Sequence, residues 1–190
     1  MNTLPVIVAV TGASGAPYAR RLLQCLADGG VPAHVVASAA GRLVYRLETG
    51  RNLEEDLPNG IPLYGEEEFS APIASGSFGT RGMVVVPCTM GTLAAIANGL
   101  ANNLIHRAAD VCLKERRPLI VVPRETPLSL VHLKNMVALT EAGGLVLPPA
   151  PGFYHQPRRV DDLVDFIVGR ILDHLDLPQQ LIPPWQGLST

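Results

Sequence analysis

The 190-residue sequence is poor in aromatic residues and in charge. Aromatic side chains make up 5 % of the chain and charged side chains 17 %. Fifteen basic residues against seventeen acidic ones leave a formal net charge of −2. A nucleic-acid-binding domain carries a strongly basic face, so this balance argues against a nucleic-acid partner.

Cysteines are too few and too scattered for a disulfide framework. Cys25, Cys88 and Cys112 are odd in number, and no two of them form a CxxC pair. The five histidines show no HExxH motif or other close ligand spacing of the kind that zinc sites use. We therefore expect no disulfide, no metal cofactor and a cytoplasmic location.

Long hydrophobic runs are also missing. A membrane-spanning helix needs about 20 apolar residues. The apolar runs here are short, such as Val84–Pro87 and Leu119–Pro123. The first ten residues lack the basic region of a signal peptide. The mean hydropathy of +0.24 is nevertheless high, with 47 % hydrophobic residues. Burial of apolar surface between subunits accounts for it better than a membrane does, which predicts a homo-oligomer.

What the chain does contain is an alternation of apolar runs with amphipathic segments. Continuous apolar runs such as Val6–Val10 are typical of parallel strands that are buried on both faces. The pattern predicts a doubly wound parallel α/β sheet in a single domain over residues 1–175. Residues 176–190 form a tail that packs on the site or on a neighbouring subunit. The other expected strands are His34–Ala37, Met83–Val86, Leu119–Val122 and Leu145–Leu147, and the clearest expected helices are Arg42–Glu48, Leu104–Arg116, Leu130–Glu141 and Val160–Leu175.

Two stretches fit this pattern less well. Residues 51–79 have weak periodicity, with an edge strand expected at Ile61–Tyr64 and a loop expected over APIASGSFG, residues 71–79. Pro87–Cys88 is expected to break the strand that precedes it, because proline has no N–H to donate to a neighbouring strand.

Loops that follow the strands are the candidates for a ligand site. Thr11–Ala16 reads TGASGA and joins a strand to a helix, where glycine lets the backbone approach a ligand and free N–H groups favour an anion. Pro87–Thr92 reads PCTMGT and repeats this arrangement. Either loop alone could be an ordinary tight turn or a threonine helix cap. Together they favour a cradle for a phosphate or a ring edge.

Several charged and aromatic residues allow two interpretations. Arg124 and Glu125 follow a strand and suit a phosphate ligand, although a surface salt bridge is the alternative. Spacing alone makes Lys114 a helix-dipole partner and Glu48 an ordinary exposed carboxylate. The aromatic loop Gly152–Pro157, GFYHQP, is suited to cover an apolar ligand.

The motifs TGASGAPY, CTMGTLAAIANGLANNLIHRAADVCLKERRPLIVVPRETP and PGFYHQP resemble the UbiX/Pad1 flavin prenyltransferases, flavoproteins also described as aromatic-acid decarboxylases. The resemblance runs from about Val6 to Leu175. It implies a flavodoxin-like or Rossmann-like fold and a homo-oligomer built of trimers, typically a dodecamer, with FMN at subunit interfaces. In this family dimethylallyl phosphate alkylates reduced FMN at N5 and C6. The prenylated FMN then serves UbiD-type decarboxylases, as in ubiquinone biosynthesis, and no metal takes part.

The resemblance also implies roles for individual residues. The flavin would be held by Gly12, Ala13, Ser14, Ser38, Thr89, Met90, Gly91, Thr92 and Arg124. The phosphate of the prenyl donor would be bound by Lys114, Arg124, Tyr154 and Arg170. Ser14, Glu48, Lys114 and Glu125 would be catalytic, the two glutamates by managing protons and Ser14 beside the reacting N5. Trp185 would cover the site from the tail. For Glu48 and Lys114, only the resemblance supports these roles.

Two other functions remain as alternatives. An FMN-dependent cysteine decarboxylase needs a catalytic histidine after the second strand, and Ser38–Gly41 contains none. A non-enzymatic FMN-binding subunit of a decarboxylase would be expected to lose its phosphate-site residues. All of those residues are present.

Overall fold

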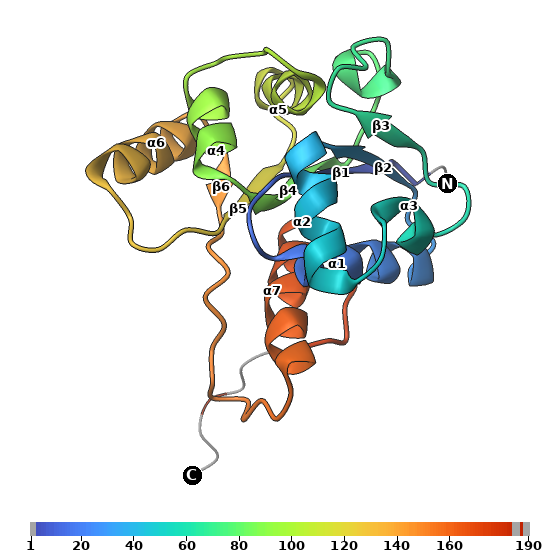
Figure 1. Ribbon diagram of the computed structural model, residues 1–190, viewed down its shortest axis with the longest axis vertical. Coiled ribbons are helices and arrows are strands. Elements are labelled where there is room, and N and C mark those ends of the chain that lie inside the picture. Colours follow the sequence, from blue (N-terminus) through green and yellow to red (C-terminus); the bar gives the residue numbers. More distant parts are fainter. Residues whose placement is uncertain (1–2, 184–186, 188–190) are drawn as a thin grey trace.

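The computed structural model describes residues 3–183 and Gly187. Within them, six parallel strands form one sheet in the order β3-β2-β1-β4-β5-β6 (Figure 1). The strands are β1 (Val6–Val10), β2 (Ala33–Ala37), β3 (Leu63–Gly65), β4 (Gly82–Cys88), β5 (Leu119–Pro123) and β6 (Leu145–Val146). Because β1 pairs with β2 on one side and β4 on the other, the strand order reverses there. The predicted doubly wound parallel sheet is confirmed.

Helices cover both faces of the sheet. Val6, Val8 and Val10 pack into a core with α1 and α7, whereas Ile7 and Ala9 pack into a second core with α4 and α5. A strand buried on both faces has no polar side to present, which is why β1 reads as an unbroken apolar run. The helices are α1 (Ala16–Asp28), α2 (Ala39–Thr49), α3 (Leu53–Asp56), α4 (Met90–Ala97), α5 (Leu104–Lys114), α6 (Leu130–Glu141) and α7 (Val160–His174), with a short 3₁₀ turn at Pro72–Ala74.

Two sequence expectations need correction. Pro87 and Cys88 lie inside β4 instead of ending it, and the pairing of β4 with β5 shifts register between Val85 and Cys88. The lost proline N–H is thus absorbed by a local irregularity in the pairing. The loop expected over residues 71–79 contains the 3₁₀ turn at Pro72–Ala74. Helix α3 was not predicted, because four residues with only Leu53 buried show no helical periodicity.

The segment between β6 and α7 leaves the sheet. Residues 147–159 form an arm that extends away from the domain before α7 returns to pack on α1 (Figure 1). The aromatic loop GFYHQP belongs to this arm. None of the helices in the described residues is long and apolar enough to cross a membrane.

Candidate active site

Thr11 locks together the loops that follow β1 and β4. Its side chain is buried, and its Oγ1 donates to the carbonyl of Pro87 at 2.8 Å. The same oxygen accepts from the N–H of Thr89 at 2.9 Å. The two loops therefore meet at one edge of the sheet, as the sequence predicted. Thr11 itself was not among the expected site residues, although it belongs to the TGASG motif.

Arg124 brings the loop after β5 to the same edge. Its N–H donates to the carbonyl of Cys88 at 3.2 Å, and its Nε donates to the carbonyl of Ser14 at 3.3 Å. The side chain of Arg124 remains exposed to solvent. A cation is thus held beside Ser14 with most of its donors still available to a ligand.

Glu48 reaches across from α2 to the first turn of α1. Its Oε2 accepts from the N–H groups of Gly15 at 2.9 Å and Ala16 at 2.8 Å. Burial raises the pKa of this carboxyl, but hydrogen bonds from the Ser14 side chain and the two amides outweigh burial. With the positive charge of Arg124, they hold the pKa of Glu48 below its ordinary value. Glu48 is therefore a fixed carboxylate beside Ser14, and not an unattached surface residue.

Two glycines allow the start of α2, with its cap residue Ser38, to pack closely against the end of β1 and Gly12. A Cβ on Gly12 would lie 2.7 Å from the Cβ of Ala40, and one on Gly41 would lie 2.4 Å from the carbonyl oxygen of Val10. Both distances are too short for any larger residue. The first turn of α2 can thus approach the end of β1 only because both positions are glycine.

Glu66, which sequence reasoning did not single out, holds the start of α2 from the other side. Its Oε1 accepts from the N–H of Ala39 at 3.0 Å, and its Oε2 accepts from the side-chain amide of Asn103 at 3.2 Å. In the sequence Glu66 is the first of three consecutive glutamates. Nothing in that run distinguishes it from a solvated charge.

These contacts identify which helix N-terminus suits the phosphate of a flavin nucleotide. Helices α1, α2 and α4 all begin at this edge, and the first two already hold Glu48 and Glu66. At α4 the Thr89 side chain accepts from Thr92, while the N–H groups of Met90 and Gly91 have no acceptor within the described residues. Free N–H groups at a helix N-terminus bind anions. The residues present therefore fit FMN, whose phosphate the start of α4 would be able to hold.

The remaining predicted residues are not brought together within one protomer. Lys114 ends α5 at the opposite edge of the sheet, where its Nζ pairs with Glu115 at 2.7 Å. Tyr154 lies in the arm with its ring against Phe166, and Arg170 on α7 pairs with its own helix. Glu125 follows Arg124 and is exposed, with its carboxylate accepting from the N–H of Thr126. Trp185 lies outside the described residues.

Among the described residues there is also no cluster of three or more histidine, cysteine or acidic side chains that could hold a metal ion. The carboxyl edge instead offers glycine loops, a free helix N-terminus and one exposed arginine. This combination, on a doubly wound sheet, is that of an α/β protein that binds a phosphate-bearing nucleotide, a class to which flavin nucleotides belong.

Known proteins agree with this class. The Flavoprotein family model matches residues 1–172. Flavin prenyltransferase UbiX of Pseudomonas aeruginosa is 47 % identical over 95 % of this chain and 93 % of its own. A solved structure of AnUbiX (PadA1) with FMN and dimethylallyl pyrophosphate has a TM-score of 0.95 at 41 % identity, covering 99 % of this chain and all of that one. A dodecameric FMN-dependent UbiX-like decarboxylase from Escherichia coli O157:H7 has a TM-score of 0.92 at 44 % identity, covering 97 % and 100 %. The chain belongs to the flavoprotein family and, within it, to the UbiX flavin prenyltransferases.

Proposed function

We propose that this protein transfers a dimethylallyl group from dimethylallyl phosphate to N5 and C6 of reduced FMN. The observation that carries the proposal is the grouping, beside Ser14, of a free helix N-terminus, an exposed arginine and a carboxylate fixed on α1. The first can take the phosphate of the flavin and the second a departing phosphate. The third can take or return a proton.

The bond changes balance without an oxidant or a reductant. The allylic C–O bond breaks, the phosphate leaves with the electron pair, and a C–N bond forms at N5 as the N5 proton departs. The second bond joins C6 to the far alkene carbon, and the C6 hydrogen is transferred as a proton to the neighbouring carbon. Two proton movements therefore need an acid or a base. Glu48, which accepts a hydrogen bond from the Ser14 side chain, and Glu125, which follows Arg124 in the chain, are the carboxylates that we propose for them.

Charge develops in opposite senses on the two halves of the donor. Negative charge grows on the leaving phosphate, where fixed cations stabilise the transition state by about 2.7–4 kcal/mol for each well-placed donor. Positive charge spreads over the dimethylallyl group, which aromatic faces can shelter. Water must be kept away from that cation. The aromatic arm carrying Tyr154 is suited to exclude it.

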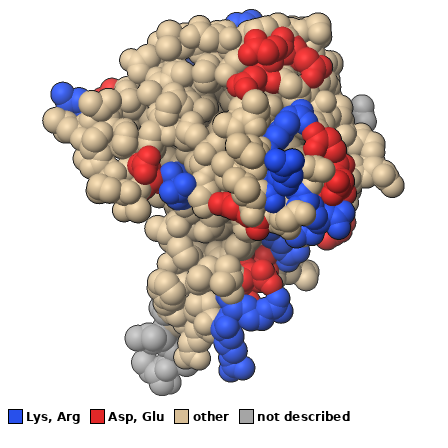
Figure 2. All heavy atoms as spheres, in the orientation of Figure 1, with Lys and Arg blue, Asp and Glu red and all other residues tan. Residues whose placement is uncertain are grey.

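In this proposal neighbouring protomers supply Lys114, Tyr154 and Arg170 to the site. Lys114 ends α5 at the opposite edge of the sheet, Tyr154 lies in the arm, and Arg170 pairs with Asp173 on its own helix. We propose that assembly of a homo-oligomer, a trimer-based dodecamer, completes the phosphate site. Helix α6 supports assembly, because Leu130, Val131 and Val137 on it are more than half exposed. The face that carries α4 and α6 shows few charged side chains (Figure 2). In this proposal the prenylated FMN passes to a UbiD-type decarboxylase in the cytoplasm.

The activity can be tested directly by mass spectrometry. The purified protein is incubated without oxygen with FMN, dithionite and either dimethylallyl phosphate or dimethylallyl pyrophosphate. We expect a flavin heavier by one prenyl unit, and the two arms identify the donor. Recovery of unmodified FMN from both arms would contradict the proposal. Protein without dithionite is the control, since N5 of oxidised flavin is an electron-poor imine nitrogen that attacks the allylic carbon poorly, whereas reduction makes it an electron-rich amine.

A complementation experiment tests whether neighbouring protomers share the site. We expect the Lys114→Ala and Glu48→Gln proteins each to lose most prenyl transfer. When the two are co-assembled, some sites receive a normal Lys114 from one chain and a normal Glu48 from the other, so activity should return. The matched control co-assembles Arg124→Ala with Glu48→Gln. Arg124 and Glu48 lie beside Ser14 of the same chain, so every site in this mixture keeps one defect and activity should not return. Equal activity in the two mixtures would mean that Lys114 is not supplied by a neighbour.

A further inference from the structure

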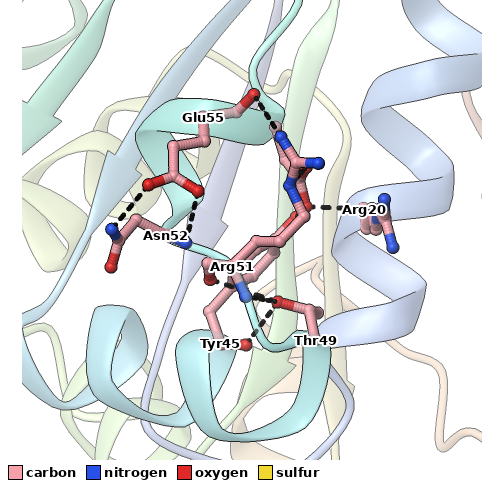
Figure 3. Close-up of polar contacts among 7 residues, drawn as sticks. Arg20, Tyr45, Thr49, Arg51, Asn52 and Glu55 are labelled. Atoms are coloured by element: carbon pink, nitrogen blue, oxygen red, sulfur yellow. Dashed lines mark hydrogen bonds and ion pairs between the residues drawn. The ribbon is translucent and has the colours of Figure 1, made fainter.

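Asp56 is a buried carboxylate that joins two partly exposed arginines outside the flavin loops. Its side chain is only 7 % exposed, although the sequence around it gave no sign of a folded element. The Asp56 carboxylate accepts from the Tyr45 hydroxyl at 3.0 Å and pairs with the Nε of Arg51 at 2.7 Å and the Nε of Arg20 at 3.2 Å. Figure 3 shows Arg20, Tyr45 and Arg51 converging from α1, α2 and the turn that follows α2.

The turn at the end of α2 places Arg51 beside the Asp56 carboxylate. Gly50 adopts a left-handed conformation with φ 72° and ends the helix. Thr49 accepts from the N–H of Arg51 at 3.3 Å and donates to the carbonyl of Tyr45 at 2.7 Å, which fixes the turn (Figure 3). Asn52 then starts α3 with a capping box to Glu55, and Asp56 follows.

This cluster and the Glu48 contact form two consecutive links between the same two helices. On α1, Ala16 and Arg20 are four residues apart, and on α2 Tyr45 and Glu48 are three apart. Residues at these spacings lie one above the other on a helix face. The first link is Glu48 to the N–H groups of Gly15 and Ala16, and the second, one turn away, is Tyr45 to Arg20 through Asp56. The separation of the last turn of α2 from α1 is therefore set by Asp56.

We propose that Asp56 is a positioning residue for Glu48: it holds the last turn of α2 at the distance from which the Glu48 carboxylate reaches the first amides of α1. This inference rests on the proposed role of Glu48 in prenyl transfer. A buried carboxylate that loses its charge attracts the two arginines far more weakly, so the contacts that tie α2 to α1 through Asp56 loosen. Glu48, one turn away, then loses its fixed place beside Ser14.

The test compares substitutions in the full-length oligomer. Asp56→Asn removes the charge, and Tyr45→Phe removes only the hydroxyl from the cluster while the buried ring stays in place. The matched control is Glu54→Gln, which lies two residues from Asp56 and also pairs α3 with an arginine of α2, but is exposed and pairs with Arg42 near the start of that helix. Glu48→Ala gives the reference value for loss of the carboxylate.

Amide hydrogen exchange is measured on the peptide that contains Gly15 and Ala16, together with kcat and KM for FMN. We expect Asp56→Asn to raise exchange there toward the Glu48→Ala value and to lower kcat about tenfold with KM unchanged, since small misplacements of a catalytic group cost at least this much. We expect Tyr45→Phe to raise exchange and lower kcat by smaller amounts. If Asp56→Asn does not fold, Tyr45→Phe is the variant that tests whether the cluster positions Glu48. Glu54→Gln should match the wild type.

Two outcomes would overturn the inference. One is normal exchange of this peptide in folded Asp56→Asn or Tyr45→Phe protein while Glu48→Ala exchanges faster. The other is normal exchange in Glu48→Ala. The hydrogen bonds from Gly15 and Ala16 to Glu48 would then not protect these amides, and Asp56 could not act on them through Glu48. Failure of the proposed function looks different. Glu48→Ala would keep full prenyl transfer, and the exchange comparison would still report whether Asp56 positions Glu48.

Discussion

Replacing Glu48 with glutamine is expected to lower prenyl transfer by about 10²–10⁴ while FMN remains bound, which is the range for loss of a positioned acid or base. Glutamine keeps the length of the side chain, and its carbonyl oxygen can still accept from Gly15 and Ala16. It cannot accept the proton that N5 releases. Single-turnover rates of flavin prenylation, measured by mass spectrometry with FMN affinity determined separately, check both halves of this expectation.

The pH dependence gives Glu48 an independent signature. Because its pKa is held below the ordinary value in the folded protein, the carboxylate stays charged as the pH falls past the ordinary carboxyl pKa of about 4.3. Its contribution to stability is present above that pH and is lost as the pH falls through the lower, folded-state value. Glu48→Gln should remove this loss of stability at low pH.

Glu67→Gln, which changes an exposed glutamate, is the control and should leave the transfer rate and the pH dependence unchanged. A fully active Glu48→Gln protein would refute the proton-handling role.

The parts of the fold that the sequence predicted are those determined by local composition. Val6–Val10 reads as a strand because all five side chains are apolar and must be buried, and the expected bounds of α6, Leu130–Glu141, agree with the structure. Loop chemistry was also predictable, since TGASGA and PCTMGT fall between a strand and a helix and must therefore meet at the carboxyl edge. Helix α3 was not, because four residues complete only one helical turn.

The rest of the site depends on contacts between distant segments. Glu48 meets Ala16 across 32 residues, and Arg124 meets Ser14 across 110. Neither distance leaves a periodic pattern that a single sequence could reveal. For Lys114 the local pattern was right about its own protomer. Its spacing indicated a helix-dipole partner, and it does lie at the C-terminus of α5, at the opposite edge of the sheet from Ser14. The resemblance to the prenyltransferases, and not any local pattern, first linked Lys114 to the phosphate.

Arg124→Ala is the second substitution with a large expected effect, a loss of about 10²–10³ in the rate of prenyl transfer. The main-chain hydrogen bond from Arg124 to Cys88 does not depend on the side chain, so the loop should stay in place. What is lost is the cation beside Ser14, and with it a charge that lowers the pKa of Glu48. Removing a positive charge disfavours the carboxylate, so the acid limb of kcat should move to higher pH.

Arg124→Lys separates charge from geometry. Lysine keeps the positive charge that acts on Glu48 but lacks the planar fork that binds two phosphate oxygens at once. We therefore expect Arg124→Lys to retain the acid limb of the wild type while its transfer rate falls between those of Arg124→Ala and the wild type. Arg46→Ala, which removes an exposed arginine from α2, is the control for a general loss of positive charge. If Arg124→Ala transferred the prenyl group at the wild-type rate with the same acid limb, the leaving phosphate would have to be stabilised without Arg124, by cations of neighbouring protomers alone.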